Sequence, residues 1–305
     1  KDSILLNEEK GPLTLEDEQK NARAVSYYQN DLLETRKNFK NGKKEGRMEA
    51  FEKGYLVLRG NYKSDLQDGL WERFKHNGKI SRKTNYKEGK KDGLREIYEK
   101  GFLLESAHYK KGDLHGQNET YYESSNVLSY RTNFKSGKKD GLLENFCSNG
   151  KILLRENYRD GKKDGLSETF YTNHLIQSEG PQVKERMYFK DDKTEGHYEQ
   201  FDAGGNLLQV GNYKSGRREG LWETFLCPEN LVLKRHNWLE GLRHGLQEDF
   251  YPNGSIMYRG RMHKGKSIGG WERFDMTGNL NVIDSGADPY PTEPEDSLID
   301  DGIPF

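Results

Sequence analysis

The chain has 305 residues, of which 32% are hydrophobic, 32% are charged and 11% are aromatic, and its formal net charge is −1. So little apolar material argues against a deep globular core, while the aromatic residues and 34 glycines argue against a wholly disordered chain. Such a composition favours a thin, regular architecture. No apolar run approaches the roughly 20 residues that a membrane-spanning helix needs.

Residues 1–24 form an N-terminal segment, and a repeat domain follows over residues 25–280. In that domain an aromatic residue recurs about every 24 positions, with glycine seven, glutamate ten and a second aromatic residue twelve places after it. We count ten copies, and so regular a period predicts a tandem repeat protein. The ten glycines are Gly46, Gly69, Gly93, Gly116, Gly141, Gly165, Gly196, Gly220, Gly245 and Gly269. The ten glutamates are Glu49, Glu72, Glu96, Glu119, Glu144, Glu168, Glu199, Glu223, Glu248 and Glu272.

Two kinds of turn separate these anchors. One is glycine-rich, as in residues 87–93, and the other is a short turn such as Asn77-Gly78. Asn-Gly is a strong hairpin signal because a type I′ turn needs positive φ at both positions. Each copy therefore contains two strands. The sequence predicts an all-β fold, an elongated antiparallel β-meander solenoid of about ten tandem β-hairpins with roughly 20 to 22 strands.

The pairing register follows from the short turns. A two-residue turn at Asn77-Gly78 places Glu72 opposite Lys83, which predicts a cross-strand ladder of acids and bases. The same register sets Tyr86 over Gly69. We expect the missing side chain of this glycine to leave room for the tyrosine ring.

Alternation along the strands sorts the residues by face. The glutamate face repeats almost unchanged, whereas the other face carries a position that differs from copy to copy. Because Trp, Tyr and Arg dominate binding hot spots, we predict that this variable position binds a partner. The predicted partner-binding residues are Trp71, Arg95, Leu143, Tyr198, Trp222 and Trp271. The alternative interpretation is that the tryptophans only cover thin parts of the sheet.

Two segments depart from the pattern. The 31 residues between Tyr158 and Phe189 leave an insertion at residues 173–185, and such loops often carry function. Residues 260–267 have the spacing of a phosphate-binding P-loop. That motif must open a helix, but here the repeat register predicts a strand over residues 271–274.

The sequence offers no set of residues for catalysis. A catalytic residue is needed once, whereas the repeat glutamate occurs ten times and suits a structural charge pair. The eight histidines and two cysteines lack metal-ligand spacing, so we predict no enzyme activity, no cofactor and no metal. The basic residues are spread along the repeats, which argues against nucleic acid as a partner. Residues 281–305 hold seven acids and no base, which predicts a disordered acidic tail.

Three units, Tyr86–Tyr98, Tyr158–Phe170 and Tyr213–Phe225, resemble the MORN-variant repeat. The resemblance covers roughly residues 25–280, and the chain looks like a bacterial branch often labelled as antitoxins. Members of that branch also occur as immunity proteins beside secreted effectors, including phospholipase effectors of type VI secretion. The chain departs from the pattern at Asp65 and Asp192, which replace the usual turn glycine. We expect these two residues to alter the local shape of their turns and to lie where the partner is recognised.

The resemblance implies a non-catalytic antitoxin or immunity protein that binds and neutralises a cognate toxic effector, with a secreted phospholipase as one candidate. A toxin that attacks lipid or cell wall from outside the cytoplasm would place the chain in the periplasm, and the cytoplasm is the alternative. The second hypothesis is a membrane-associated or structural scaffold, because eukaryotic relatives of the repeat have been linked to membranes and to protein assembly. Membrane contact is the less favoured interaction. The sequence leaves the oligomeric state, the identity of the toxin and the binding face open.

Overall fold

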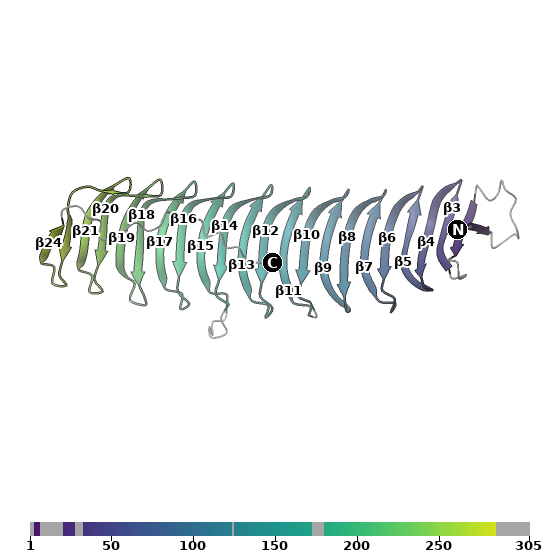
Figure 1. The fold of residues 1–305 in the computed structure, drawn as a ribbon, viewed down its shortest axis with the longest axis horizontal. Helices are drawn as coiled ribbons and strands as arrows, with labels where there is room; N and C mark the ends of the chain where they lie inside the picture. Colours follow the sequence, from purple (N-terminus) through teal and green to yellow (C-terminus); the bar gives the residue numbers. More distant parts are fainter. Residues whose placement is uncertain (1–2, 7–20, 28–32, 124, 173–179, 285–305) are drawn as a thin grey trace. The chain divides into compact units, whose positions relative to one another are not determined.

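The computed structural model describes residues 3–6, 21–27, 33–123, 125–172 and 180–284. The described residues form 24 strands joined by turns, in two compact units, Lys1–Gly150 and Lys151–Phe305. In each unit nearly every strand pairs antiparallel with the strand that follows it in the chain (Figure 1). The predicted all-β meander of hairpins is therefore confirmed.

The strand boundaries follow the repeat. The first unit contains β1 (Ser3–Leu6), β2 (Asn21–Tyr27), β3 (Leu33–Lys40), β4 (Lys43–Glu52), β5 (Tyr55–Lys63), β6 (Leu66–Phe74), β7 (Ile80–Lys87), β8 (Lys90–Glu99), β9 (Phe102–Lys110), β10 (Asp113–Tyr121), β11 (Leu128–Lys135) and β12 (Lys138–Phe146). The second unit contains β13 (Ile152–Arg159), β14 (Lys162–Phe170), β15 (Val183–Lys190), β16 (Lys193–Phe201), β17 (Leu207–Lys214), β18 (Arg217–Leu226), β19 (Leu231–Leu239), β20 (Leu242–Phe250), β21 (Ile256–His263), β22 (Lys266–Ser267), β23 (Trp271–Phe274) and β24 (Leu280–Asp284).

The register predicted from the Asn-Gly turn is confirmed, since Glu72 lies opposite Lys83 and Gly69 lies opposite Tyr86. The expected reason for the glycine is wrong. A Cβ added at Gly69 would meet nothing within 4 Å, so no ring fills that space. Instead Gly69 has a φ of 73°, and all ten repeat glycines have positive φ. Glycine is therefore present because the backbone adopts a conformation that side chains disfavour.

A register shift of the β-bulge type accompanies the repeat glycine in the first nine copies. Where β7 pairs with β8, the register shifts between Thr84 and Tyr86. A bulge leaves a ladder group without its strand partner, and the asparagine side chain at position 85 compensates, because its Nδ2 donates to the Leu94 carbonyl at 2.8 Å. The same bond recurs in the second unit from Asn237 to the Leu246 carbonyl, at 2.7 Å. The recurring Asn of the repeat thus stabilises the bulge.

Asp65 and Asp192 do not alter the turns, which corrects the expectation from the sequence. Both adopt positive φ, 69° and 67°, as the usual glycine would. The Asp65 N–H donates to the Lys44 carbonyl at 3.0 Å, just as the Gly89 N–H donates to a carbonyl of the preceding hairpin. In addition the Asp65 carboxylate accepts the Lys44 N–H at 2.8 Å. Any role of these residues toward a partner stays a prediction.

Two of the segments singled out in the sequence lie wholly or partly outside the described residues. These are residues 173–179 of the insertion and residues 285–305 of the acidic tail. The segment with P-loop spacing is described, and it forms the end of β21, a turn and β22. Strand β23 follows, as the repeat register predicts.

Candidate functional site

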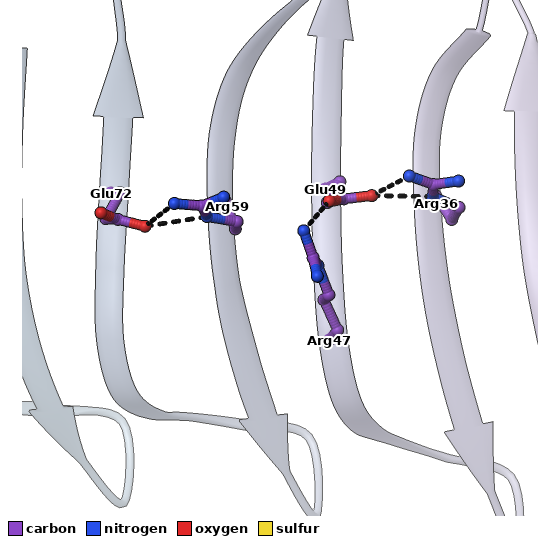
Figure 2. A network of polar contacts seen from close by, with 5 residues as sticks. All are labelled: Arg36, Arg47, Glu49, Arg59 and Glu72. Carbon is purple, nitrogen blue, oxygen red and sulfur yellow. Dashed lines mark hydrogen bonds and ion pairs between the residues drawn. The ribbon is translucent and has the colours of Figure 1, made fainter. Parts of the chain in front are cut away.

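One face of the sheet carries the repeat glutamates, and we call it the charge-ladder face. On β3 to β6, Arg36 lies opposite Glu49 and Arg59 lies opposite Glu72 (Figure 2). The Nε atoms of Arg36 and Arg59 each donate to their glutamate at 2.8 Å. Burial alone would raise the pKa of Glu49, but hydrogen bonds from Arg36 and Arg47 outweigh it and hold the pKa below its ordinary value. The predicted acid–base ladder is confirmed here.

The ladder continues in the second unit. Arg186 lies between two glutamates and contacts Glu168 at 3.1 Å and Glu199 at 3.0 Å. The arginines also lie over the second aromatic residues of the repeat, as Arg186 does over Phe201 with 5.9 Å from Cζ to the ring centroid. Carboxylate, guanidinium and ring thus pack as one structural unit, repeated with little change. The geometry gives the glutamates a structural role.

The opposite face, which we call the packing face, carries the predicted partner-binding residues in one row that crosses the strands. In the first unit this inner row runs through Met48, Gly60, Trp71, Thr84, Arg95, Ala107, Asn118, Thr132 and Leu143. In the second unit it runs through Glu156, Ser167, Met187, Tyr198, Gly211, Trp222, His236, Gln247, Gly260 and Trp271.

Five of the six predicted residues are buried in this row. Trp71, Leu143, Tyr198, Trp222 and Trp271 are between 2% and 6% exposed. The sixth, Arg95, is partly exposed and forms an ion pair with Glu105 at 2.9 Å. The six residues do not form one cluster, although Tyr198 and Trp222 come together with ring centroids 5.1 Å apart.

Each tryptophan packs on a glycine of the preceding strand. A Cβ at Gly60 would overlap the Trp71 indole, and Gly211 and Gly260 have the same relation to Trp222 and Trp271. In the sequence, glycine stands eleven places before tryptophan in these three copies and at no other copy of that position. Comparing one strand position across the copies does not reveal this pairing, whereas comparing positions on two neighbouring strands does. The pairing shows that variation along the inner row is coupled by size between neighbouring strands.

Three of the buried aromatic residues of the inner row also have internally bonded polar groups. The indole N–H of Trp71 donates to the Asn61 carbonyl at 3.1 Å, and that of Trp222 donates to the Asn212 carbonyl at 3.1 Å. The Tyr198 hydroxyl donates to Glu185 at 2.8 Å, and burial first, then this carboxylate, raises its pKa far above the ordinary range. The geometry therefore matches the alternative that these residues cover the sheet. Their role toward a partner stays a prediction that no observation tests.

A second row on the packing face is both variable and solvent-accessible, and we call it the outer row. It lies two residues along each strand from the inner row and was not singled out in the sequence. In the first unit it contains Leu58, Arg73, Arg82, Ile97, Glu105, Thr120, Tyr130 and Asn145. In the second unit it contains Leu154, Thr169, Glu185, Gln200, Gln209, Thr224, Lys234, Asp249, Tyr258 and Arg273. Asp249 is buried, and the others are partly or fully exposed.

Two shallow hollows open beside the outer row of the first unit. One, of about 390 Å³, is lined by Ala50, Val57, Leu58, Arg73 and Phe74 among others. The other, of about 140 Å³, lies above Trp71 and Tyr86 and is bordered by Arg73 and Arg82. Across the described ranges no group of three or more His, Cys, Asp or Glu side chains could hold a metal ion. Nor do those ranges contain a helix of the length and apolar character that a membrane crossing requires.

Three segments match the family model of the MORN repeat variant. They are residues 67–88, 194–215 and 243–263. Each begins on the second strand of one copy and ends at or just after the first strand of the next, so the match frames the hairpins β6–β7, β16–β17 and β20–β21. The match confirms MORN-type repeats at these three sites, a repeat type that is generally non-catalytic and often binds partners or membranes. No curated protein matches the chain.

Proposed function

We propose that this chain is a non-catalytic binding protein that neutralises a cognate toxic effector, as an antitoxin or immunity protein does. The observation that carries the proposal is the outer row, where residues that vary from copy to copy meet solvent on an otherwise fixed framework. Repeat scaffolds use such a surface to bind partners. The contact surface is thus the outer row, and the inner row beside it on the same face sets its shape.

The form of this surface favours a protein over a small molecule as the partner. Small-molecule sites are concave and enclose most of their ligand, whereas the two hollows beside the outer row are shallow and open. A row of mixed polar and apolar side chains along a sheet suits a second protein surface, with contacts distributed over several strands. The repeat glutamates are occupied in the charge ladder, and burial removes much of the inner row from solvent.

The kind of effector is proposed from the resemblance to immunity proteins. A secreted phospholipase is the candidate that this resemblance supports, and a phospholipase that acts on the membrane from outside the cytoplasm would place the complex in the periplasm. Binding would block its active site or a motion that the enzyme needs.

The test is capture of partners by the full chain from extracts of the source organism, followed by assay of the captured enzyme. The test variant carries Gln200→Ser, Gln209→Ser and Lys234→Ser in the outer row. A matched control carries Tyr188→Ser and Leu221→Ser, both exposed on the charge-ladder face. We expect one stoichiometric effector, inhibited by the wild-type chain and by the control, and bound more weakly by the outer-row variant.

Three results would count against the proposal. A captured effector that keeps its full activity would remove the neutralising role. Equal loss of binding in both variants would remove the outer row as the contact surface. Binding to phospholipid vesicles without any protein partner would favour the membrane scaffold.

A further inference from the structure

The outer row of the first unit contains a pair of like charges that the fold does not explain. Arg73 on β6 lies directly opposite Arg82 on β7, and both side chains are exposed. Like charges directly opposite each other destabilise an antiparallel pair. Among the described residues neither guanidinium has an ion pair or a ring contact, whereas the arginines of the charge-ladder face are bonded to glutamates.

The chain contains its own comparison for this site. The sequence Trp-Glu-Arg-Phe occurs at residues 71–74 and again at residues 271–274. In the second occurrence Arg273 lies opposite Val282, and its Cζ lies 5.8 Å from the centroid of the Tyr258 ring. The tryptophan and glutamate of the motif keep their places in both occurrences. Two opposed arginines are therefore not a requirement of the motif, and in the described outer row they meet only at Arg73 and Arg82.

Apolar residues flank the pair on both sides. Leu58 on β5 lies opposite Arg73, and Ile97 on β8 lies opposite Arg82. The order across four neighbouring strands is apolar, cationic, cationic, apolar, over about 14 Å at the usual spacing of strands. Both hollows of the packing face border this group, the larger on its Leu58 side and the smaller between the two arginines and Trp71.

We propose that Arg73 and Arg82 together bind an acidic side chain of the protein partner, with apolar partner residues seated on Leu58 and Ile97. A guanidinium presents paired N–H donors that match a carboxylate, so two adjacent guanidiniums can hold one carboxylate from both sides. The incoming negative charge offsets the repulsion that the free chain carries between the two arginines. This inference rests on the proposed function and names the chemistry that the partner presents to the outer row.

The experiment compares full-length chains for affinity toward the captured effector. The test variant carries Arg73→Ser and Arg82→Ser, and the control carries Tyr188→Ser and Leu221→Ser, which are exposed on the charge-ladder face outside the outer row. We expect the test variant to bind at least about tenfold more weakly, as truncation of a hydrogen-bonded charge does at interfaces. The control should stay within about twofold of the wild type. The test variant should remain folded, because among the described residues it removes a repulsion and no ion pair or hydrogen bond of the two side chains.

A second arm identifies the group that is bound. In the variant R73K, R82K, a carbodiimide couples a lysine amine to a carboxylate in direct contact, and mass spectrometry then locates the link. A link from residue 73 or 82 to an Asp or Glu of the effector supports the inference. The inference would be overturned if the serine variant kept its affinity, or if no link formed between residue 73 or 82 and an acidic residue of the effector. The proposed function would stand in either case. Failure of the wild-type chain to capture any stoichiometric protein would overturn both.

Discussion

At the scale of single residues, glycine serves two unrelated purposes in this chain. Gly69 adopts a φ of 73° and faces open space, so its backbone conformation is what matters. Gly60 lacks positive φ, and the Trp71 indole occupies the space where a Cβ would lie. The first kind recurs in all ten copies, and the second occurs only beneath a tryptophan. The glycines of this chain therefore fall into two classes, one required by the backbone conformation and the other by side-chain packing.

The size coupling between Gly60 and Trp71 predicts an unusual response to substitution. Alanine normally stabilises a strand relative to glycine, but Gly60→Ala would force the buried indole out of place and should cost about 1 to 3 kcal/mol, as overpacking does. Adding Trp71→Asn should restore part of that loss, because Ala107 and Asn118 already form this combination two copies further along the chain. The free energies of local opening from hydrogen exchange on β5 and β6 measure both effects.

The control for this cycle is Trp71→Asn alone, which leaves Gly60 uncovered. If the two single substitutions simply add in the double variant, Gly60 and Trp71 are not coupled and the inner row varies for another reason. A stabilising Gly60→Ala would contradict the packing argument directly.

At the scale of the hairpin, acidic side chains connect several turns to the hairpin before them. The Glu45 carboxylate accepts the Ser64 N–H at 2.8 Å, and the Asp92 carboxylate accepts the Lys111 N–H at 3.0 Å. Both acids immediately precede a repeat glycine. Asp65 adds a bond in the reverse direction, to the Lys44 N–H of the earlier turn. Hairpins are thus joined at their turns as well as along their strands.

Asp65 combines positive φ with an accepting carboxylate, and substitutions can separate the two. Asp65→Ala should destabilise the turn by about 1 to 2 kcal/mol for the left-handed conformation, plus about 1 kcal/mol for the lost hydrogen bond. Asp65→Gly should lose only the hydrogen bond, and Asp65→Asn should keep both contributions. Hydrogen exchange at the Lys44 amide, which donates to Asp65, measures the difference. Equal protection in all three variants would mean that the bond does not stabilise the turn.

The turns explain why the sequence predicts the fold so well and the site less well. Asn77-Gly78 fixes the register, and from it the Glu72–Lys83 pair and the two faces follow. Alternation assigns Trp71 to a face of the sheet but does not predict how far its side chain is buried. In a single-layer sheet that burial depends on the size of the residues on neighbouring strands. The outer row was missed for the same reason. Arg73 and Arg82 could have been found, since counting outward from the Asn-Gly turn already places the two like charges opposite each other.

At the scale of the whole molecule, the pairing order sets how stability is distributed. Within each unit the described strands pair with strands that lie next to or close to them in the sequence. Among the described strands, none therefore connects distant copies. In such repeat architectures the stability approximates a sum of terms for each repeat and for each interface with a neighbour. A local loss of packing is therefore not shared by the whole chain, as it would be around a single core.

Trp71 and Trp222 allow a matched test of this locality, because they occupy equivalent positions in different units. Each Trp→Ala variant removes a large buried side chain, a change that typically costs about 3 to 5 kcal/mol. We expect Trp71→Ala to raise hydrogen exchange on β5 to β8, and Trp222→Ala to raise it on β16 to β20, with the other unit nearly unchanged in each case. The outer row of the undisturbed unit would then keep its shape, so each variant would also report which unit holds the partner. A uniform rise in exchange along the chain in both variants would instead mean that the repeats unfold as one cooperative body, and the division of stability among neighbouring strands would be wrong.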